Sequence, residues 1–384
     1  MEGLVAGLRA EARRMGFSSV GVAGPDASTH LHHYREWVAS GYHGEMAYLA
    51  RDESTARRGD LSGTLEGVRS VIVVTHEYAQ PDPAGVPEDP SRAVIARYAR
   101  GDDYHEVVKE KLEVLGRWLG GQGGDVEARA YVDTGPILER DLAQRAGLGW
   151  FGKNTVLINP ERGSYFFLGL LLVDVELPVD EPFTAERCGT CSACLSACPT
   201  GALLGLDEKG APVMDARKCI SYLTIELRGA IPVELRPLMG NRVFGCDICQ
   251  EVCPWNVRFS EVAEEPAYSA RSELDGPSLV ELADRLLAMS GKGFTREFAG
   301  SAVTRTGRKG LLRNVCVALG NWGVEETVPT LVSALSDPAP IVRGHAAWAL
   351  GRVGSPAALE ALSSRLAEES DPFALEEIGL ALGR

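Results

Sequence analysis

Eight of the nine cysteines lie between residues 188 and 253, and their spacing constrains the chain more than any other feature. The first run reads C-x-x-C-x-x-C-x-x-x-C-P over residues 188–199. This is the spacing of bacterial ferredoxin-type [4Fe–4S] binding, in which three thiolates hold one cluster and the fourth reaches a second. A second group follows at Cys246, Cys249 and Cys253-Pro254, with Cys219 between the runs. The sequence therefore predicts two four-ligand clusters and a protein that handles electrons.

Crossed ligation divides the eight thiols into two sets of four. The first cluster takes Cys188, Cys191, Cys194 and Cys253, and the second takes Cys198, Cys219, Cys246 and Cys249. The second run lacks a middle cysteine, so Cys219, which lies well before it in the sequence, must supply the missing ligand. Zinc is the alternative metal, but zinc sites usually use two separated C-x-x-C pairs. Three cysteines at strict three-residue spacing favour the iron–sulfur cubane.

Composition describes an ordinary globular protein. The 384 residues suffice for two or three domains, and 45% are hydrophobic. No apolar run is long enough to cross a bilayer, and the N-terminal 16 residues lack a signal peptide's apolar core. These features predict a cytoplasmic protein without a membrane partner, and we expect a monomer. The ninth cysteine, Cys316, occupies an apolar helical position and is interpreted as a core residue.

Secondary-structure patterns predict three domains. Alternating helices and apolar strands, such as Val71 to Thr75 and Tyr165 to Val173, indicate an α/β domain over residues 1–180. Residues 181–260 form the cluster domain. In residues 261–384 the triplet Ala-Leu-Gly recurs at 318–320, 349–351 and 381–383, which predicts HEAT-type helical pairs. This last domain serves either as a stabilising cap or as a binding surface.

Two partial motifs concern ligand binding in the α/β domain. Residues 147–152 match G-x-G-x-x-G, but they follow a predicted helix rather than a strand, which disfavours a dinucleotide site. A glycine loop that allows close approach to another flat or bulky ligand fits better. Asp103-Tyr104-His105 begins the D-x-H-x-x-G pattern of histidine-ligated cobalamin, but Val108 occupies its glycine position. A cobalamin here would not be ligated in that way.

Asp133 is the main acid–base candidate. It ends a predicted buried strand, at the edge where open α/β sheets bind ligands. A carboxyl group in such a place can hold a proton and donate it. The alternative is that Asp133 caps the helix predicted after Pro136. Sequence alone leaves both interpretations open.

A basic segment contrasts with the net charge of −14, which alone argues against a nucleic-acid partner. Residues 291–320 contain six cations and one acid, Glu297. This concentration predicts phosphate binding, and a solvated helix face is the alternative. The predicted nucleic-acid contacts are Arg296, Arg305, Arg308, Lys309 and Arg313, with Arg343 one repeat further along.

Taken together, these parts resemble the epoxyqueuosine reductase family, the enzymes that finish queuosine in tRNA. The resemblance spans nearly the whole chain. It is carried by Tyr131–Pro136, Gly149–Asn154, Cys188–Gly201, Cys219–Glu226, Gly245–Asn256 and Gly310–Asn314. Only the cysteine runs are generic, whereas all the segments in this order are highly specific.

The resemblance implies a nitroreductase-like core, similar to that of reductive dehalogenases, which binds cobalamin without a histidine ligand. It places Cys219 among the cluster ligands and matches Asp133 to the family's proposed proton donor. The residues at the family's cobalamin-contacting positions are Arg57, Tyr98, Asp133, Asn154, Ser164, Ser221, Tyr222, Leu223 and Thr224. The implied reaction takes electrons from an external donor through the clusters to cobalt. Reduced cobalt then acts on the epoxide of epoxyqueuosine in the tRNA anticodon, and Asp133 protonates the leaving oxygen.

Two other functions compete with this one. An iron–sulfur electron-transfer subunit would use the helical repeats to dock a protein partner. A reductive dehalogenase-like enzyme would act on a small molecule, but such a substrate needs neither the basic segment nor the repeats.

Overall fold

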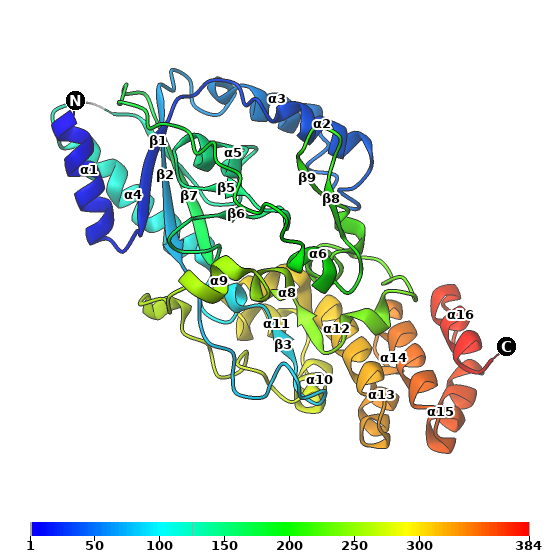
Figure 1. Cartoon of the computed structure of the whole chain (residues 1–384). Helices are drawn as coiled ribbons and strands as arrows, with labels where there is room; N and C mark the ends of the chain where they lie inside the picture. Colours follow the sequence, from blue (N-terminus) through cyan, green and yellow to red (C-terminus); the bar gives the residue numbers. More distant parts are fainter. Residues whose placement is uncertain (1, 125, 384) are drawn as a thin grey trace. The chain divides into compact units, whose positions relative to one another are not determined.

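A four-stranded sheet lies at the centre of the first half of the chain in the computed structural model, which describes residues 2–124 and 126–383 (Figure 1). Its strand order is β1-β2-β7-β4, and all neighbouring strands are antiparallel. The strands span Ser19–Ala23 (β1), Ser70–Glu77 (β2), Phe166–Val173 (β7) and Ala128–Tyr131 (β4). The two central strands, β2 and β7, are the two apolar runs predicted from the sequence, and both are almost entirely buried.

Helices cover both faces of this sheet (Figure 1). Helices α1 (Glu2–Arg14) and α4 (Tyr104–Gly120) lie on one side, and α5 (Glu139–Arg145) lies on the other. Gly169 in β7 allows α4 to approach closely, because a Cβ atom there would lie 2.9 Å from Val108 and 3.0 Å from Leu112. On the opposite face, Leu170 packs with the side chains of α5. Burial on both faces explains why these strands are continuously apolar rather than alternating.

Short elements and the loops between them make up the cysteine-containing segments and their surroundings. These are the hairpins β5 (Trp150–Phe151) with β6 (Leu157–Ile158) and β8 (Leu203–Leu206) with β9 (Pro212–Met214), and the helices α6 (Ala193–Ala197), α7 (Ile220–Ile225), α8 (Ile248–Glu251) and α9 (Pro254–Phe259). Two further helices, α2 (Leu31–Ala39) and α3 (Asp52–Gly59), follow β1.

By its internal contacts the chain forms two compact units, each made of three segments. Unit 1 contains Met1–Gln80, Asp103–Arg217 and Asp247–Ser269, and unit 2 contains Pro81–Asp102, Lys218–Cys246 and Ala270–Arg384. These units cut across the predicted ranges 1–180, 181–260 and 261–384, whose outer ends, residues 1 and 384, lie outside the described residues. The three-domain division by function stays a prediction.

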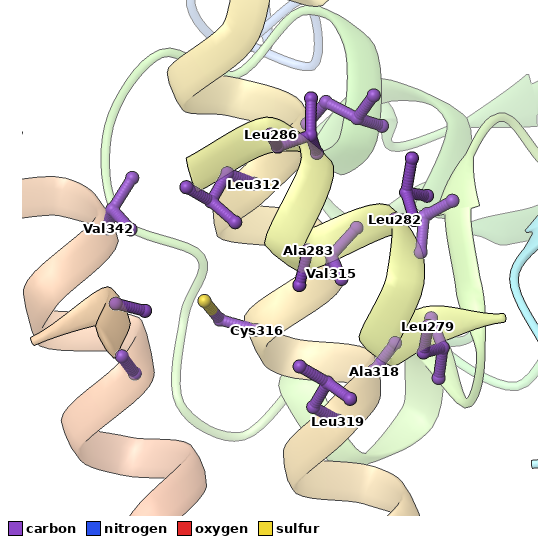
Figure 2. Close-up of a cluster of buried hydrophobic side chains, with 14 of the residues drawn as sticks. Leu279, Leu282, Ala283, Leu286, Leu312, Val315, Cys316, Ala318, Leu319 and Val342 are labelled. Carbon is purple, nitrogen blue, oxygen red and sulfur yellow. The ribbon is translucent and has the colours of Figure 1, made fainter. Parts of the chain in front are cut away.

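Unit 2 combines a small parallel sheet with helical repeats. Strand β3 (Val94–Ile95) pairs with β10 (Arg242–Phe244). The repeat helices are α10 (Leu279–Ala288), α11 (Gly291–Glu297), α12 (Gly307–Trp322), α13 (Val328–Ala334), α14 (Pro340–Val353), α15 (Pro356–Leu366) and α16 (Pro372–Ala381). Figure 2 shows apolar side chains of α10 and α12 packed together, with Cys316 among them. The core interpretation of Cys316 is confirmed, because none of its surface is exposed.

The Ala-Leu-Gly triplets have a packing reason. A Cβ atom on Gly320 in α12 would lie 2.8 Å from Cα of Ala349 in α14. A Cβ atom on Gly351 in α14 would likewise lie 2.8 Å from Cβ of Ala381 in α16. Each glycine therefore allows its helix to pack closely against the helix of the next repeat, α12 against α14 and α14 against α16. This packing confirms the predicted stack of repeats. Across the part of the chain that is described, no helix combines the length and the apolar character needed to cross a membrane.

Candidate functional site

The thiols predicted for the first cluster lie together in unit 1. Cys188, Cys191, Cys194 and Cys253 line one pocket, between the loop that follows residue 187 and the start of α9. The apolar wall behind Cys253 is formed by Trp150 and Ile158, with Phe183 and Trp255 packed against it.

The chemistry of this thiol set fits a [4Fe–4S] cluster. Burial raises the pKa of Cys194, and the neighbouring Cys188 and Cys253 raise it further. Burial likewise raises the pKa of Cys253. Four such thiols close together repel one another as thiolates unless a metal centre compensates their charge. The iron atoms of an iron–sulfur cluster supply the compensating positive charge, and the apolar wall shields the cluster from solvent.

The glycine-rich segment 147–154 packs against the first cluster loop. The Nζ atom of Lys153 donates hydrogen bonds to the carbonyl oxygens of Gly189 (2.6 Å) and Cys191 (2.9 Å). Nδ2 of Asn154 donates to the carbonyl oxygen of Cys249 at 3.4 Å. Lys153 therefore holds the loop that carries three of the thiols.

The glycines of this segment are needed for protein packing. A Cβ atom on Gly149 would lie 2.2 Å from the carbonyl oxygen of Ile158, and one on Gly152 would lie 2.5 Å from the Ile158 side chain. At these two positions the close approach is therefore to β6, whereas the sequence predicted an approach to a ligand.

The thiols predicted for the second cluster are divided between the units. Cys198 and Cys249 belong to unit 1, whereas Cys219 and Cys246 belong to unit 2. Burial alone would raise the pKa of Cys198, but hydrogen bonds from the Thr200 hydroxyl and from the backbone N–H groups of residues 200, 202 and 203 bring it below the usual value. Donors aimed at a sulfur atom favour the thiolate form that binds metal. In unit 2, Cys219 is the residue before α7, and Cys246 follows β10 by two residues.

Asp133 lies in a turn directly after the edge strand β4. Its backbone is left-handed (φ 54°), and its Oδ2 atom accepts a hydrogen bond from the Tyr104 hydroxyl at 2.9 Å. The sheet is antiparallel, so the strand-edge rule for parallel sheets does not explain this position. The alternative that Asp133 caps the next helix is wrong, because α5 begins at Glu139 with Leu138 as its N-cap.

Glu139 is a second carboxyl group at this turn. Its Oε1 atom accepts the backbone N–H of Asp133 at 2.8 Å. The side chain is only partly exposed, and burial, together with the charge of Asp133, raises the pKa of Glu139 to about 8. The next residue, Arg140, donates to the carbonyl oxygen of Thr155, another left-handed residue. The site thus has one carboxyl group that is exposed and another that holds its proton at neutral pH.

Sequence reasoning missed Tyr104, Glu139 and Arg140. A signal for Glu139 was present, since an acid six residues after Asp133 marks the start of α5. Tyr104 lies inside the failed D-x-H-x-x-G pattern, where no rule pointed to it.

The predicted cobalamin contacts fall in both units. In unit 1, Arg57 is partly exposed and pairs with Glu53 at 2.7 Å, whereas Ser164 is buried and donates to Gln250 at 2.9 Å. The Oδ1 atom of buried Asn154 has no hydrogen-bond partner among the described residues, so it can accept a bond from a bound group. An acceptor of this kind fits the amide side chains of a corrin. The contacts predicted in unit 2 are Tyr98, Ser221, Tyr222, Leu223 and Thr224.

The basic residues of unit 2 divide into buried and exposed sets. Arg313 is 1% exposed and donates to carbonyl groups inside the unit, and Arg343 is held by Glu369 at 2.7 Å. Arg308 is held by Asp337. Phosphate contacts for Arg313 and Arg343 are therefore not supported, since their guanidinium groups face the interior. Arg296, Arg305 and Lys309 are exposed, and Arg305 pairs with Glu226 at 2.8 Å.

Three family models match parts of the chain. They are "Epoxyqueuosine reductase QueG, DUF1730" over residues 58–134, "4Fe-4S double cluster binding domain" over residues 187–256, and "HEAT repeats" over residues 301–383. The second match contains all eight clustered cysteines, and the predictions of two [4Fe–4S] clusters and of HEAT repeats are confirmed.

Similar proteins cover nearly the whole chain. An epoxyqueuosine reductase from Pseudomonas aeruginosa is 43% identical over 347 residues, which are 89% of this chain and 92% of that protein. One from Escherichia coli is 43% identical over 341 residues, 88% of this chain and 86% of that protein. A solved epoxyqueuosine reductase with a tRNA-Tyr epoxyqueuosine-modified stem loop has a TM-score of 0.90 and 31% identity, covering 100% of this chain and 98% of that one. The Bacillus subtilis enzyme, solved with an aspartate-bearing catalytic loop swung out of its active site, has a TM-score of 0.88 and 30% identity, covering 100% of this chain and 99% of that one.

Proposed function

Because the chain belongs to the epoxyqueuosine reductase family, we propose that this oxidoreductase reduces epoxyqueuosine to queuosine in tRNA with Asp133 as the proton donor. The observation that carries the proposal is the turn after β4. It holds Asp133 in a left-handed conformation. The Tyr104 hydroxyl donates a hydrogen bond to the Asp133 carboxyl group, and the Glu139 carboxyl group accepts one from the Asp133 backbone N–H.

The reaction removes one oxygen atom from an epoxide. Both carbon–oxygen bonds break, a carbon–carbon double bond forms, and the oxygen leaves as water, so two electrons and two protons are consumed. When bound, the two clusters supply single electrons, and the cobalamin that we propose supplies a low-potential metal. An external donor provides the electrons. The protein must therefore provide protons at the oxygen and keep bulk water away from it.

Asp133 is suited to proton delivery by its contacts. The Tyr104 hydroxyl donates to one carboxyl oxygen and orients the group. The other oxygen is left to face a substrate, since the side chain is exposed. A catalytic loop that bears an aspartate in the Bacillus subtilis relative supports a working role for this turn.

The tRNA substrate is proposed to meet the exposed cations of unit 2. Arg296, Arg305 and Lys309 keep their side chains at the surface, where phosphate contacts position RNA without reading its sequence. The relative solved with a modified stem loop supports an RNA substrate of this kind. The monomeric state, the location in the cytoplasm and the need for an external electron donor stay predictions.

The test is direct reconstitution. The anaerobically purified protein is given cobalamin, a reductant and tRNA carrying epoxyqueuosine. The tRNA is then digested to nucleosides, which are identified by mass spectrometry. We expect queuosine to form. Its absence, with both clusters and corrin demonstrably loaded, would overturn the proposal. An electron-transfer subunit predicts neither corrin binding nor tRNA binding, and a dehalogenase-like enzyme predicts corrin binding without tRNA binding.

Asp133→Asn tests the proton donor. Asparagine keeps the size and the acceptor for Tyr104 but has no acidic proton, so turnover should fall by about 10²–10⁴-fold. Cluster and corrin absorption should stay at the wild-type level. Unchanged turnover would return Asp133 to a structural role.

A further inference from the structure

Two polar residues lie side by side in the centre of α12, in unit 2. Arg313 is 1% exposed and Asn314 is fully buried. A buried guanidinium group and a buried amide destabilise a helix core unless their donors are all paired. The partners of these two side chains therefore show what the residues do.

Asn314 joins two segments that carry cysteines. Its Nδ2 atom donates to the carbonyl oxygens of Thr224 and Val243, both at 2.8 Å. Thr224 lies in α7, which starts directly after Cys219, and Val243 lies in β10, three residues before Cys246. One amide group thus bridges the segments of two predicted ligands of the second cluster.

Arg313 fixes the chain that leaves α7. It donates to the carbonyl oxygens of Leu223 (2.6 Å), Leu227 (2.8 Å) and Gly229 (2.8 Å). Its remaining donors reach Oδ1 of Asn314 at 2.9 and 3.0 Å, which orients the amide. The guanidinium group therefore anchors both the end of α7 and the bridging amide.

Thr224 completes the connection. Its hydroxyl donates to the carbonyl oxygen of Ile220 at 2.7 Å and accepts the backbone N–H of Gly245 at 2.9 Å. Gly245 is the residue before Cys246, and Ile220 is the residue after Cys219. A single hydroxyl thus links the neighbours of the two cysteines.

The opposite side of α12 is held by the apolar core. Leu312, Val315, Cys316 and Leu319 pack there among buried side chains (Figure 2). The elements next to the two cysteines are short by contrast: α7, which follows Cys219, has six residues, and β10, which precedes Cys246, has three. Helices and strands this short have little stability of their own.

We infer that Arg313, Asn314 and Thr224 are positioning residues for the second [4Fe–4S] cluster. They hold Cys219 and Cys246 at a fixed separation within unit 2, with α12 as the rigid support. This inference rests on the proposed ligand set, in which both cysteines bind that cluster. The first cluster has all four of its predicted ligands in unit 1 and does not depend on these contacts.

The test compares the two clusters within one protein. Asn314→Asp keeps the size and the acceptor for Arg313 but removes the donor, and Thr224→Val removes only the hydroxyl. In the anaerobic holoprotein we measure iron and sulfide per chain, the electron paramagnetic resonance signal of each reduced cluster, and the rate of iron loss to a chelator. We expect half of the iron to be lost about tenfold faster in Asn314→Asp and several-fold faster in Thr224→Val, while the other half keeps the wild-type rate.

Two controls separate positioning from general stability and from the ligand set. Arg343→Met breaks the buried pair with Glu369 in the same unit, and it should lower the unfolding temperature while both clusters keep their wild-type rates. Cys219→Ala should lose four irons, and retention of eight would refute the ligand set itself. If Cys219→Ala loses four irons but the Asn314 and Thr224 variants lose iron at the wild-type rate, the positioning role is overturned. Equal acceleration for both clusters in Thr224→Val, the milder variant, would also overturn it.

Discussion

Replacement of Glu139 by glutamine should change how stability depends on pH. Glutamine has the same shape, stays neutral, and its side-chain oxygen can still accept the backbone N–H of Asp133. In the wild-type protein, burial and the Asp133 charge raise the pKa of Glu139 from 4.5 to about 8. The folded protein therefore keeps a proton at this carboxyl through a pH range in which the unfolded chain has released it.

The sign and the size of the effect follow from this difference. The contribution of the protonated carboxyl is fully present below pH 4.5 and is lost as the pH rises towards 8. The slope is at most about 1.4 kcal/mol of unfolding free energy per pH unit, and solvent at the partly exposed side chain reduces it. For a folded unit of about 200 residues, 1 kcal/mol corresponds to roughly 2–4 °C in the unfolding midpoint. Glu139→Gln should therefore be closest to the wild type at pH 5 and become progressively more stable than it towards pH 8.

The assay is thermal unfolding of the anaerobic holoprotein at pH 5, 6, 7 and 8, at one heating rate because unfolding of a cluster protein is not reversible. The control is Glu53→Gln, which removes an exposed carboxyl group elsewhere in the same unit, and its difference from the wild type is subtracted at each pH. A difference between Glu139→Gln and the wild type that stays constant from pH 5 to pH 8 would refute the reasoning, because Glu139 would then be ionised throughout.

Three further predictions concern the cluster wall and the cores. Trp150→Ala should lower the free energy of unfolding by about 3–5 kcal/mol and make the first cluster bleach faster in air, because this 2%-exposed ring packs against Cys253. Thermal unfolding measures the first effect and visible absorption the second. Trp150→Phe should lose less stability and bleach more slowly than Trp150→Ala. Arg236→Met should cost about 3–5 kcal/mol in thermal unfolding, because it leaves the Glu377 carboxylate buried without its partner, and a second change of Glu377 to methionine should recover most of that loss. Cys316→Ala should cost about 1 kcal/mol and leave the iron content unchanged, and lost iron would show that this thiol binds metal.

Local patterns were sufficient for much of the architecture. The strands β2 and β7 follow from apolar β-branched or leucine-rich runs, and the repeats follow from triplets 31 and 32 residues apart, because each pattern reports packing within a short stretch. The cysteine runs predicted two clusters for the same reason, since thiolate spacing along the chain limits which metal centre can bind.

Long-range pairing accounts for what the sequence did not reveal. Arg313 was predicted to bind phosphate because its charge is visible in the sequence, whereas its carbonyl partners lie 84 to 90 residues away. The antiparallel order of the sheet, on which the surroundings of Asp133 depend, is likewise a property of pairing between distant strands. Glu139 is six residues from Asp133, but its raised pKa arises from burial that only the folded chain provides.

The close glycine contacts between repeats restrict which residues can occupy a few positions of the helical stack. At Gly320 and Gly351 a single added methyl group would meet the next helix at 2.8 Å or closer, so even alanine requires the backbones to move apart. Apart from Lys309, which is proposed to contact tRNA, the exposed faces of the same helices carry no such steric restriction. Relatives are therefore expected to vary in the charge and shape that these helices present to solvent, while the pitch of the stack stays the same from one protein to the next.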